Sequence, residues 1–282
     1  MPLIVNTNVQ SINAQRQLSN VNMHLNKGFE RLSSGLRINR ASDDAAGLAI
    51  ANEMEADIRG SRQAVSNAQD GIALLNVADG SMQQILKNLQ RMRELTKQAA
   101  NDTYDTNKRN LIKDELDQLS SEITRIADAT TFNGEHLLNA SAATRFILQV
   151  GSGNDNATGG VDIIDIASAL GDLTASVGLT LGTTSVTTNT LANQLASRID
   201  AALSTVNAQL SRLGALTNRL EGVVSNLNVY IENVSAARSR ITDADFAAET
   251  AALTKNQILQ QSTLAILSQA NSQPQSALRL LQ

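Results

Sequence analysis

Apolar residues recur every seven positions through much of the last third of the chain. The first set is Ile199, Val206, Leu213, Leu220, Leu227, Val234 and Ile241. Four residues on from members of that set stand Leu203, Leu210, Val224 and Ile231, with interruptions at Thr217 and Arg238. Two apolar positions per heptad are typical of a coiled-coil helix. The pattern therefore predicts one long helix over residues 191–241.

Two further stripes lie in the first half of the chain. Between Ile58 and Met92 apolar residues step mostly by three and four, and the same spacing returns between Ile112 and Ile126 after the polar stretch "ANDTYDTNKR". A narrow apolar stripe on a helix needs another helix against it. The three stripes together predict a rod of three helices.

Residues 131–190 do not continue the helical spacing of apolar residues. Two short runs rich in β-formers, "TRFILQVGSG" and "GGVDIIDI", are separated by Gly, Asn and Asp. This arrangement predicts a hairpin, whereas the Gly- and Thr-rich "GLTLGTTSVTTNT" is expected to be a third strand or an exposed loop. The predicted fold is mainly α: an elongated helical bundle or coiled coil of N- and C-terminal helices, with a small β-hairpin region in the middle.

Both chain ends are almost free of charge. Residues 1–27 carry only Arg16 and Lys27 as fixed charges, residues 253–282 only Lys255 and Arg279, and neither end has an acid. Both mix amides and serines with aliphatic side chains, among them Val9, Ile12, Leu18, Leu253, Leu264 and Leu267. Such segments are suited to burial among copies of the same chain, with amides hydrogen-bonded between subunits. Frayed tails are the alternative, although disordered tails usually carry more charge and fewer aliphatics.

Between the first end and the first stripe lies "RLSSGLRINRASDDAAG", residues 31–47, called here the joint. Gly35 can end one helix, and Ser42, followed by Asp43 and Asp44, can cap the next. Arg31, Arg37 and Arg40 are expected to meet carboxylates on this chain or a neighbour, as a subunit interface. A solvated linker fits the spacing equally well.

Composition narrows the classes of function. The 282 residues have a net charge of −4 with scattered basic side chains, no cysteine, and 2% aromatic residues. The scattered basic side chains give no reason to expect a nucleic-acid partner. No apolar run approaches the ~20 residues of a membrane span, so no membrane partner is expected either. The two histidines, His24 and His136, are far apart and match no metal-binding motif. No catalytic residues, metal or other cofactors are predicted, so the chain is not expected to be an enzyme.

Two stretches resemble bacterial flagellin. They are "ERLSSGLRINRASDDAAGLAIAN" with "NAQDGIALLNVADG", and "ENVSAARSRITDADFAAETAALTKNQILQQSTLAILSQANSQPQSALRLLQ". The resemblance covers roughly residues 1–150 and 190–282, and implies a short flagellin that polymerises into the flagellar filament used for swimming. It implies an inner-tube helix and joint over 1–42, rod segments over 43–140, 141–190 and 191–241, and an inner-tube helix over 242–282. No large outer domains are expected.

The resemblance also implies partners and a location. Flagellins leave the cell unfolded through the flagellar type III apparatus, which fits an N-terminus without the blocks of a cleavable signal peptide. Expected partners are copies of the chain itself, the flagellar cap and hook–filament junction proteins, and an export chaperone covering residues 253–281. The mature protein would be extracellular, in the filament.

A host receptor is implied by the same resemblance. "LQRMRELTKQAAN", residues 89–101, is similar to the flagellin surface recognised by Toll-like receptor 5, with matching positions Gln90, Arg91, Leu95, Gln98 and Glu115. Arg91, Glu94, Leu95 and Gln98 are expected on one broad helix face, with Leu89 and Met92 on the side of the apolar seam. Thr96 and Lys97 depart from the small or apolar residues of many recognised flagellins. From residue chemistry alone an ordinary charged face is the alternative.

Two other classes of protein are alternatives to a filament subunit. A hook–filament junction protein would use similar terminal helices but in few copies. A secretion-system needle or tip protein would need an apolar or aromatic binding patch, and the sequence does not show one.

Overall fold

The structure is a computed structural model that describes residues 7–139, 146–151, 153, 162–167, 170–176, 178–182 and 184–280, with side chains up to residue 273. The chain divides into two compact units. The terminal unit comprises residues 1–56 and 233–282, and the central unit comprises residues 57–232. The helices α2 (Ala45–Ala99) and α4 (Asn189–Thr242) contribute residues to both units.

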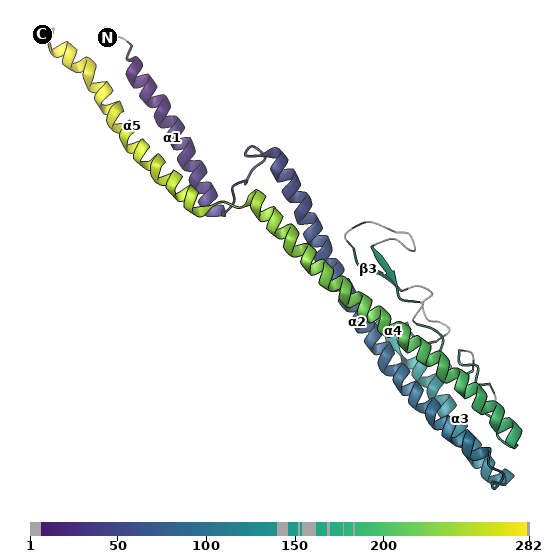
Figure 1. Cartoon of the computed structure of the whole chain (residues 1–282). Helices are drawn as coiled ribbons and strands as arrows, with labels where there is room; N and C mark the ends of the chain where they lie inside the picture. The colour runs from purple at the N-terminus through teal and green to yellow at the C-terminus, as the bar shows by residue number, and fades with distance from the viewer. Residues whose placement is uncertain are drawn as a thin grey trace. The chain divides into compact units, whose positions relative to one another are not determined.

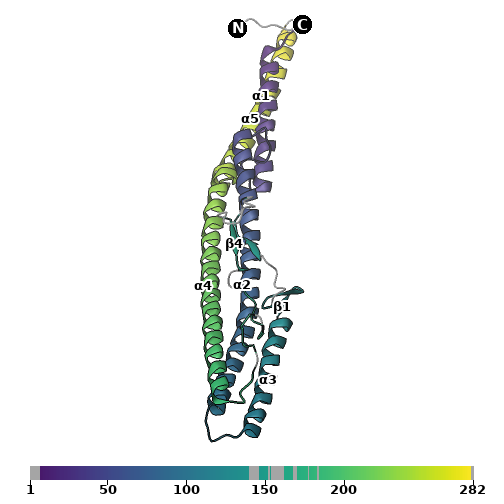
Figure 2. The same ribbon diagram turned by 90° about the vertical axis from the view of Figure 1, so that its right-hand side faces the viewer.

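In the terminal unit, α1 (Val9–Ser34) and α5 (Phe246–Leu280) lie side by side and antiparallel (Figures 1 and 2). The Asn8 side chain accepts the Ser11 N–H at 3.1 Å and caps the start of α1. Gly35 ends the helix with φ of 73°, a left-handed conformation that glycine adopts without strain. The prediction that Gly35 ends this helix is confirmed.

The central unit is built around three helices: α2 (Ala45–Ala99), α3 (Thr106–Ala129) and α4 (Asn189–Thr242) (Figure 2). Its core takes residues from all three helices, which confirms the three predicted stripes. The fully buried side chains include Leu75, Met82, Ile85, Leu89, Met92, Leu116, Ile123, Ile199, Val206 and Leu220. Beyond Leu220 the seam of α4 becomes half-buried, at Leu227 and Ile231. The mainly α fold is confirmed.

Two small antiparallel sheets accompany the helices. The predicted hairpin is present as β3 (Ile147–Gln149) paired with β4 (Ile163–Asp165). A second hairpin, β1 (Thr131–Phe132) with β2 (Glu135–His136), was not predicted. Asn133 and Gly134, both at positive φ, form its two-residue turn.

The segment 178–190 differs from its prediction. Its described residues form no strand before α4 begins, and they are not simply exposed. Leu179, Leu181 and Val186 are at most 2% exposed and belong to the core of the central unit. Three aliphatic side chains spaced among Thr and Gly therefore anchor this loop in the core, while Thr180 and Thr188 stay exposed.

None of the described helices combines the length and apolarity needed to cross a membrane.

Candidate functional site

The two terminal helices hold each other through amide contacts as well as apolar ones. Asn8 Nδ2 donates to the Ala270 carbonyl at 2.7 Å, Ser11 Oγ donates to Asn271 Oδ1 at 2.8 Å, and Gln260 Nε2 donates to Asn22 Oδ1 at 2.8 Å. These hydrogen bonds join α1 to α5 within one chain. The sequence-based expectation placed such amide bonds between subunits, and these three are intramolecular.

The predicted self-assembly residues fall into two groups. Leu18, Leu253 and Leu267 are half-buried. Val9, Ile12 and Leu264 are 55%, 56% and 49% exposed. Other large apolar side chains of the terminal unit are also exposed: Met23, Phe29, Ile50, Phe246, Ile258, Leu259 and Ile266. The α1–α5 pair thus buries one apolar stripe and leaves others open to solvent.

An open groove follows the α1–α5 pair. It has a volume of about 440 Å³, and its lining combines apolar and amide side chains: Gln10, Asn13, Ala14, Gln17, Thr263, Ile266, Gln269, Ala270 and Gln273. Charged groups are absent from this lining. The groove can therefore accept an uncharged helix face without leaving a charge desolvated.

The joint ties both chain segments of the terminal unit together. Leu36 and Asp243 form an isolated antiparallel bridge. On either side of it, the Arg37 N–H donates to the Thr242 carbonyl at 2.7 Å and the Ala244 N–H donates to the Gly35 carbonyl at 2.9 Å. Residues about 200 positions apart in sequence therefore meet here as a short pair of extended segments.

Charged side chains surround this bridge. Lys27 pairs with Asp43 at 2.6 Å, Arg40 pairs with Glu30 at 2.8 Å, and Arg31 Nη1 lies 3.5 Å from Glu249. The hydrogen bond from Lys27 lowers the pKa of Asp43 from 3.8 to about 2, assisted by the backbone N–H groups of Asn39 and Arg40.

Arg37 differs from the other two joint arginines because its guanidinium donates to a carbonyl, that of Ile241. All three arginines thus have partners on the same chain. The joint as a subunit interface stays a prediction, and so does its alternative, a solvated linker.

The cap of α2 lies two residues later than expected. Asp44 Oδ1 accepts the Gly47 N–H at 2.9 Å, which makes Asp44 the capping side chain. Ser42 lies in the preceding turn, and Asp43 is engaged by Lys27 and by the Asn39 and Arg40 N–H groups. The adjacent aspartates therefore have separate roles.

The predicted receptor face lies on α2 and α3 of the central unit. Arg91 bonds Glu115 at 2.8 Å and Glu94 at 3.2 Å, and both carboxylates raise the pKa of Arg91, Glu115 more strongly. Gln98 Nε2 donates to the Tyr104 hydroxyl at 3.0 Å. Gln90, also exposed, lines a surface groove of about 740 Å³ between α2 and α4.

One residue of this set does not belong to the open face. Leu95 is 2% exposed and packs in the core with Leu89 and Met92, so the expectation that it lies beside Arg91 and Gln98 is wrong. Thr96 is fully buried, and its hydroxyl donates to the Arg93 carbonyl. Lys97 is exposed and lines the same groove as Gln90.

Sequence reasoning missed one polar cluster altogether. Arg109 of α3 is only 8% exposed and joins the α2–α3 turn to the start of α4. The sequence gives no signal for this cluster, because the partners of Arg109 are mainly main-chain carbonyls, which every residue carries.

Comparisons with known proteins agree along nearly the whole chain. Residues 5–143 match the bacterial flagellin N-terminal helical region, and residues 196–281 match the bacterial flagellin C-terminal helical region. The flagellin of Halalkalibacterium halodurans is 43% identical over 282 residues, covering 99% of this chain and 100% of that protein. The flagellar filament 33 kDa core protein of Treponema phagedenis is 41% identical over 288 residues, with coverage of 99% and 100%.

A solved structure shares the fold. The putative flagellar hook-associated protein from Vibrio parahaemolyticus aligns with a TM-score of 0.57 and 15% identity, covering 71% of this chain and 100% of that chain. At this identity the likeness concerns architecture alone. The matches to both helical regions, together with 43% identity over almost the full length, place the chain in the bacterial flagellin family.

Proposed function

We propose that the chain is the repeating structural subunit of an extracellular flagellar filament, and that the open faces of α1 and α5 are buried between copies. The observation that carries this proposal is the set of exposed aliphatic side chains on α1 and α5, with Ile12 at 56% and Ile266 at 61%, in the segments 9–27 and 253–280 that hold four fixed charges between them: Arg16, Lys27, Lys255 and Arg279. Burial of a fully exposed aliphatic side chain is worth about 1.5–3 kcal/mol, and these side chains, just over half exposed, can gain about half of that in an assembly. Swimming motility follows from the family.

The layer assignment is part of the same proposal. Residues 1–42 and 242–282 form the inner tube, and the segments 43–140, 141–190 and 191–241 form the surrounding rod layer. The charge-poor α1–α5 pair and its uncharged groove support an inner position, because close packing of copies there desolvates few charges.

Seeded growth tests the role. Purified protein is mixed with short filament seeds, pelleted, and imaged by negative-stain electron microscopy. Long filaments growing from the seeds are expected. Protein that stays soluble and never extends a seed would favour the alternative, a hook–filament junction protein present in few copies.

A matched pair of variants tests the surface itself. Ile266→Gln places an amide on the open face of α5, where the side chain is already 61% exposed, so the subunit should fold normally. Seed extension should be lost, because the amide would be desolvated in the assembly. Ile266→Leu keeps the apolar character and should extend seeds. Normal growth of Ile266→Gln filaments would contradict the proposed interface.

Export and early partners extend the proposal. The chain is exported unfolded by the flagellar type III apparatus, and a chaperone covers residues 253–281 before export; residues 281–282 lie outside the described part of the chain. The open apolar side chains of α5, including Leu264, support the need for such a cover. The flagellar cap and hook–filament junction proteins would meet the same terminal helices at the two filament ends.

Recognition of the free subunit by Toll-like receptor 5 is a second candidate function. The supporting observation is an open polar face formed by Gln90, Arg91, Gln98 and Glu115, in which Arg91 and Glu115 are already paired. Leu95 is left out because it is buried. Arg91→Ala should weaken binding of monomer to the receptor ectodomain, whereas Arg125→Ala, which removes another exposed arginine paired on its own helix, should not. Equal binding by both variants would contradict this role.

A further inference from the structure

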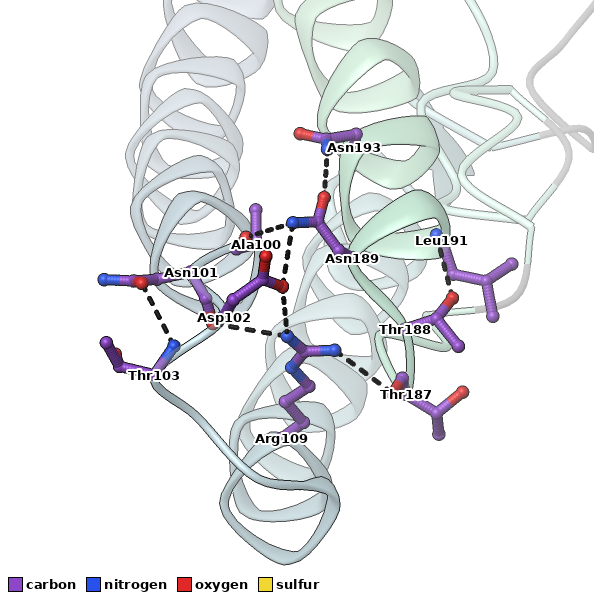
Figure 3. Close-up of polar contacts among 10 residues, drawn as sticks. All are labelled: Ala100, Asn101, Asp102, Thr103, Arg109, Thr187, Thr188, Asn189, Leu191 and Asn193. Atoms are coloured by element: carbon purple, nitrogen blue, oxygen red, sulfur yellow. Dashed lines mark hydrogen bonds and ion pairs between the residues drawn. The ribbon is translucent and has the colours of Figure 1, made fainter.

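A polar cluster joins three helix ends in the central unit (Figure 3). The Arg109 guanidinium donates to the Asn101 carbonyl at 3.2 Å and to the Thr187 carbonyl at 3.4 Å, and pairs with Asp102 at 3.3 Å. The Arg109 side chain is 10% exposed. The α2–α3 turn, the first turn of α3 and the segment before α4 therefore converge on one buried cation.

Asn189, the first residue of α4, completes the cluster. Its Nδ2 donates to the Ala100 carbonyl at 2.8 Å and lies 3.2 Å from Asp102 Oδ1. Ala100 directly follows α2, so its carbonyl is one that the helix itself leaves without a partner. Asn193 in turn donates to Asn189 Oδ1 at 2.6 Å, which holds the amide in this orientation.

The apolar seam by itself does not define how far α4 slides along α2. On α4, Ile199, Val206, Leu213 and Leu220 repeat every seven residues. On α2, Leu75, Met82 and Leu89 repeat with the same period, as do Ala78, Ile85, Met92 and Ala99. A shift of one heptad, about 10 Å along the axis, would again place apolar side chains against apolar side chains.

Exposed ion pairs contribute little to the choice of axial register between α4 and α2. Arg93 pairs with Asp200 at 2.6 Å across α2 and α4, but the two side chains are 52% and 46% exposed. Pairs of this exposure are weak in water. The Arg109 cluster differs, because a shift of α4 would withdraw the Thr187 carbonyl and the Asn189 amide, and would leave a buried guanidinium short of acceptors.

We propose that Arg109, Asp102 and Asn189 form a register lock that selects one axial pairing of α4 with α2 and α3. Apolar burial supplies the attraction between these helices, and the lock excludes the heptad-shifted alternatives. Polar groups placed at single core positions of coiled coils select register in the same way.

Distance measurement by pulsed electron paramagnetic resonance tests the lock directly. The chain has no cysteine, so Gln69→Cys and Ser204→Cys give two unique spin-label sites on exposed positions of α2 and α4. Gly71 of α2 lies beside Leu220 of the antiparallel α4. Gln69 precedes Gly71 by two residues and Ser204 precedes Leu220 by sixteen, so the labelled positions are separated by about 27 Å along the axis. A heptad shift changes this separation by about 10 Å.

The labelled protein should give one distance. Adding Arg109→Met and Asn189→Ala should produce a second population displaced by about 10 Å. Arg125→Met is the matched control, since it removes an exposed α3 arginine that pairs with Glu122 of its own helix, and should keep one distance. A helical Arg109→Met, Asn189→Ala protein with only the original distance would overturn the proposal.

A milder variant decides the question if the first does not fold. Asp102→Ala with Asn189→Ala retains Arg109 and its bonds to the Asn101 and Thr187 carbonyls. A smaller displaced population is expected here. A single unshifted distance in this folded variant would equally overturn the register lock.

Discussion

Gly71 shows how one missing side chain positions a hairpin in the central unit. A Cβ at this residue would come within 2.1 Å of Leu148 Cδ1, while the same change at Gly80 meets nothing within 4 Å. Asn67 donates to the Gln149 carbonyl at 2.9 Å beside it, so the hairpin is held where it lies. The missing side chain therefore makes room for Leu148 at Gly71, whereas at Gly80 there is open space for a side chain.

We expect different effects on stability from alanine at these two positions. Gly71→Ala should leave the free energy of unfolding about 1–3 kcal/mol below that of Gly80→Ala, because the half-buried Leu148 side chain must move, which offsets the gain in helix propensity. Gly80→Ala should raise it by roughly 0.5–1 kcal/mol, because alanine is the better helix former. Urea unfolding followed by circular dichroism measures both. A Gly71→Ala protein as stable as Gly80→Ala would show that the hairpin does not need the space.

The joint makes a prediction about pH. Because the folded pKa of Asp43 is about 2, below its ordinary value of 3.8, the contact with Lys27 is fully present above about pH 4 and is lost as pH falls through 2. Lys27→Met should raise the pKa of Asp43 toward 3.8. Carboxyl-carbon NMR titration measures it, with Glu122, whose pKa is lowered by Arg125, as the unchanged reference. An unshifted Asp43 in the variant would remove Lys27 as the cause.

The burial and the partners of single side chains were the hardest features to predict from the sequence. Leu95 was grouped with Arg91 and Gln98 by helical spacing, yet it lies three residues after Met92 and four before Ala99, both fully buried. A broad helix face includes both open and packed edges, and spacing alone does not locate the boundary. The Arg109 cluster was missed for a different reason, since main-chain carbonyl partners leave no trace in the sequence.

At the scale of elements, the capping of α2 can be tested by substitution. Asp44→Ala removes the acceptor for the Gly47 N–H and should cost about 1 kcal/mol of unfolding free energy. Ser42→Ala should change stability little, because Ser42 is not the capping residue. Thermal unfolding of both variants gives the comparison. A larger loss from Ser42→Ala would reverse the assignment.

The long helices were predictable because their signal repeats. Seven-residue spacing from Ile199 to Leu220 marks a seam that the structure buries, and Gly35 marks the end of α1. Short elements lack that redundancy. The β1–β2 hairpin rests on the single pair Asn133 and Gly134, and the burial of Leu181 and Val186 depends on a core to which all three helices contribute.

At the scale of the whole molecule, the two units differ in how they bury their apolar side chains. The central unit buries its three apolar stripes internally. The terminal unit leaves large aliphatic side chains open on α1 and α5, whose segments 9–27 and 253–280 carry few charges. The low charge of the chain ends was predicted from composition, whereas the unit boundaries after residues 56 and 232, and the face of α5 that pairs with α1, required the structure.

The most direct measurement is the behaviour of a protein ending at Ala252, which lacks residues 253–282. The central unit does not include these residues, so its helical signal and thermal unfolding should be retained. Polymerisation on seeds, measured by pelleting and electron microscopy, should be abolished because the open face of α5 is gone. Normal filaments from the truncated protein would contradict the claim that the terminal helices exist for burial between copies.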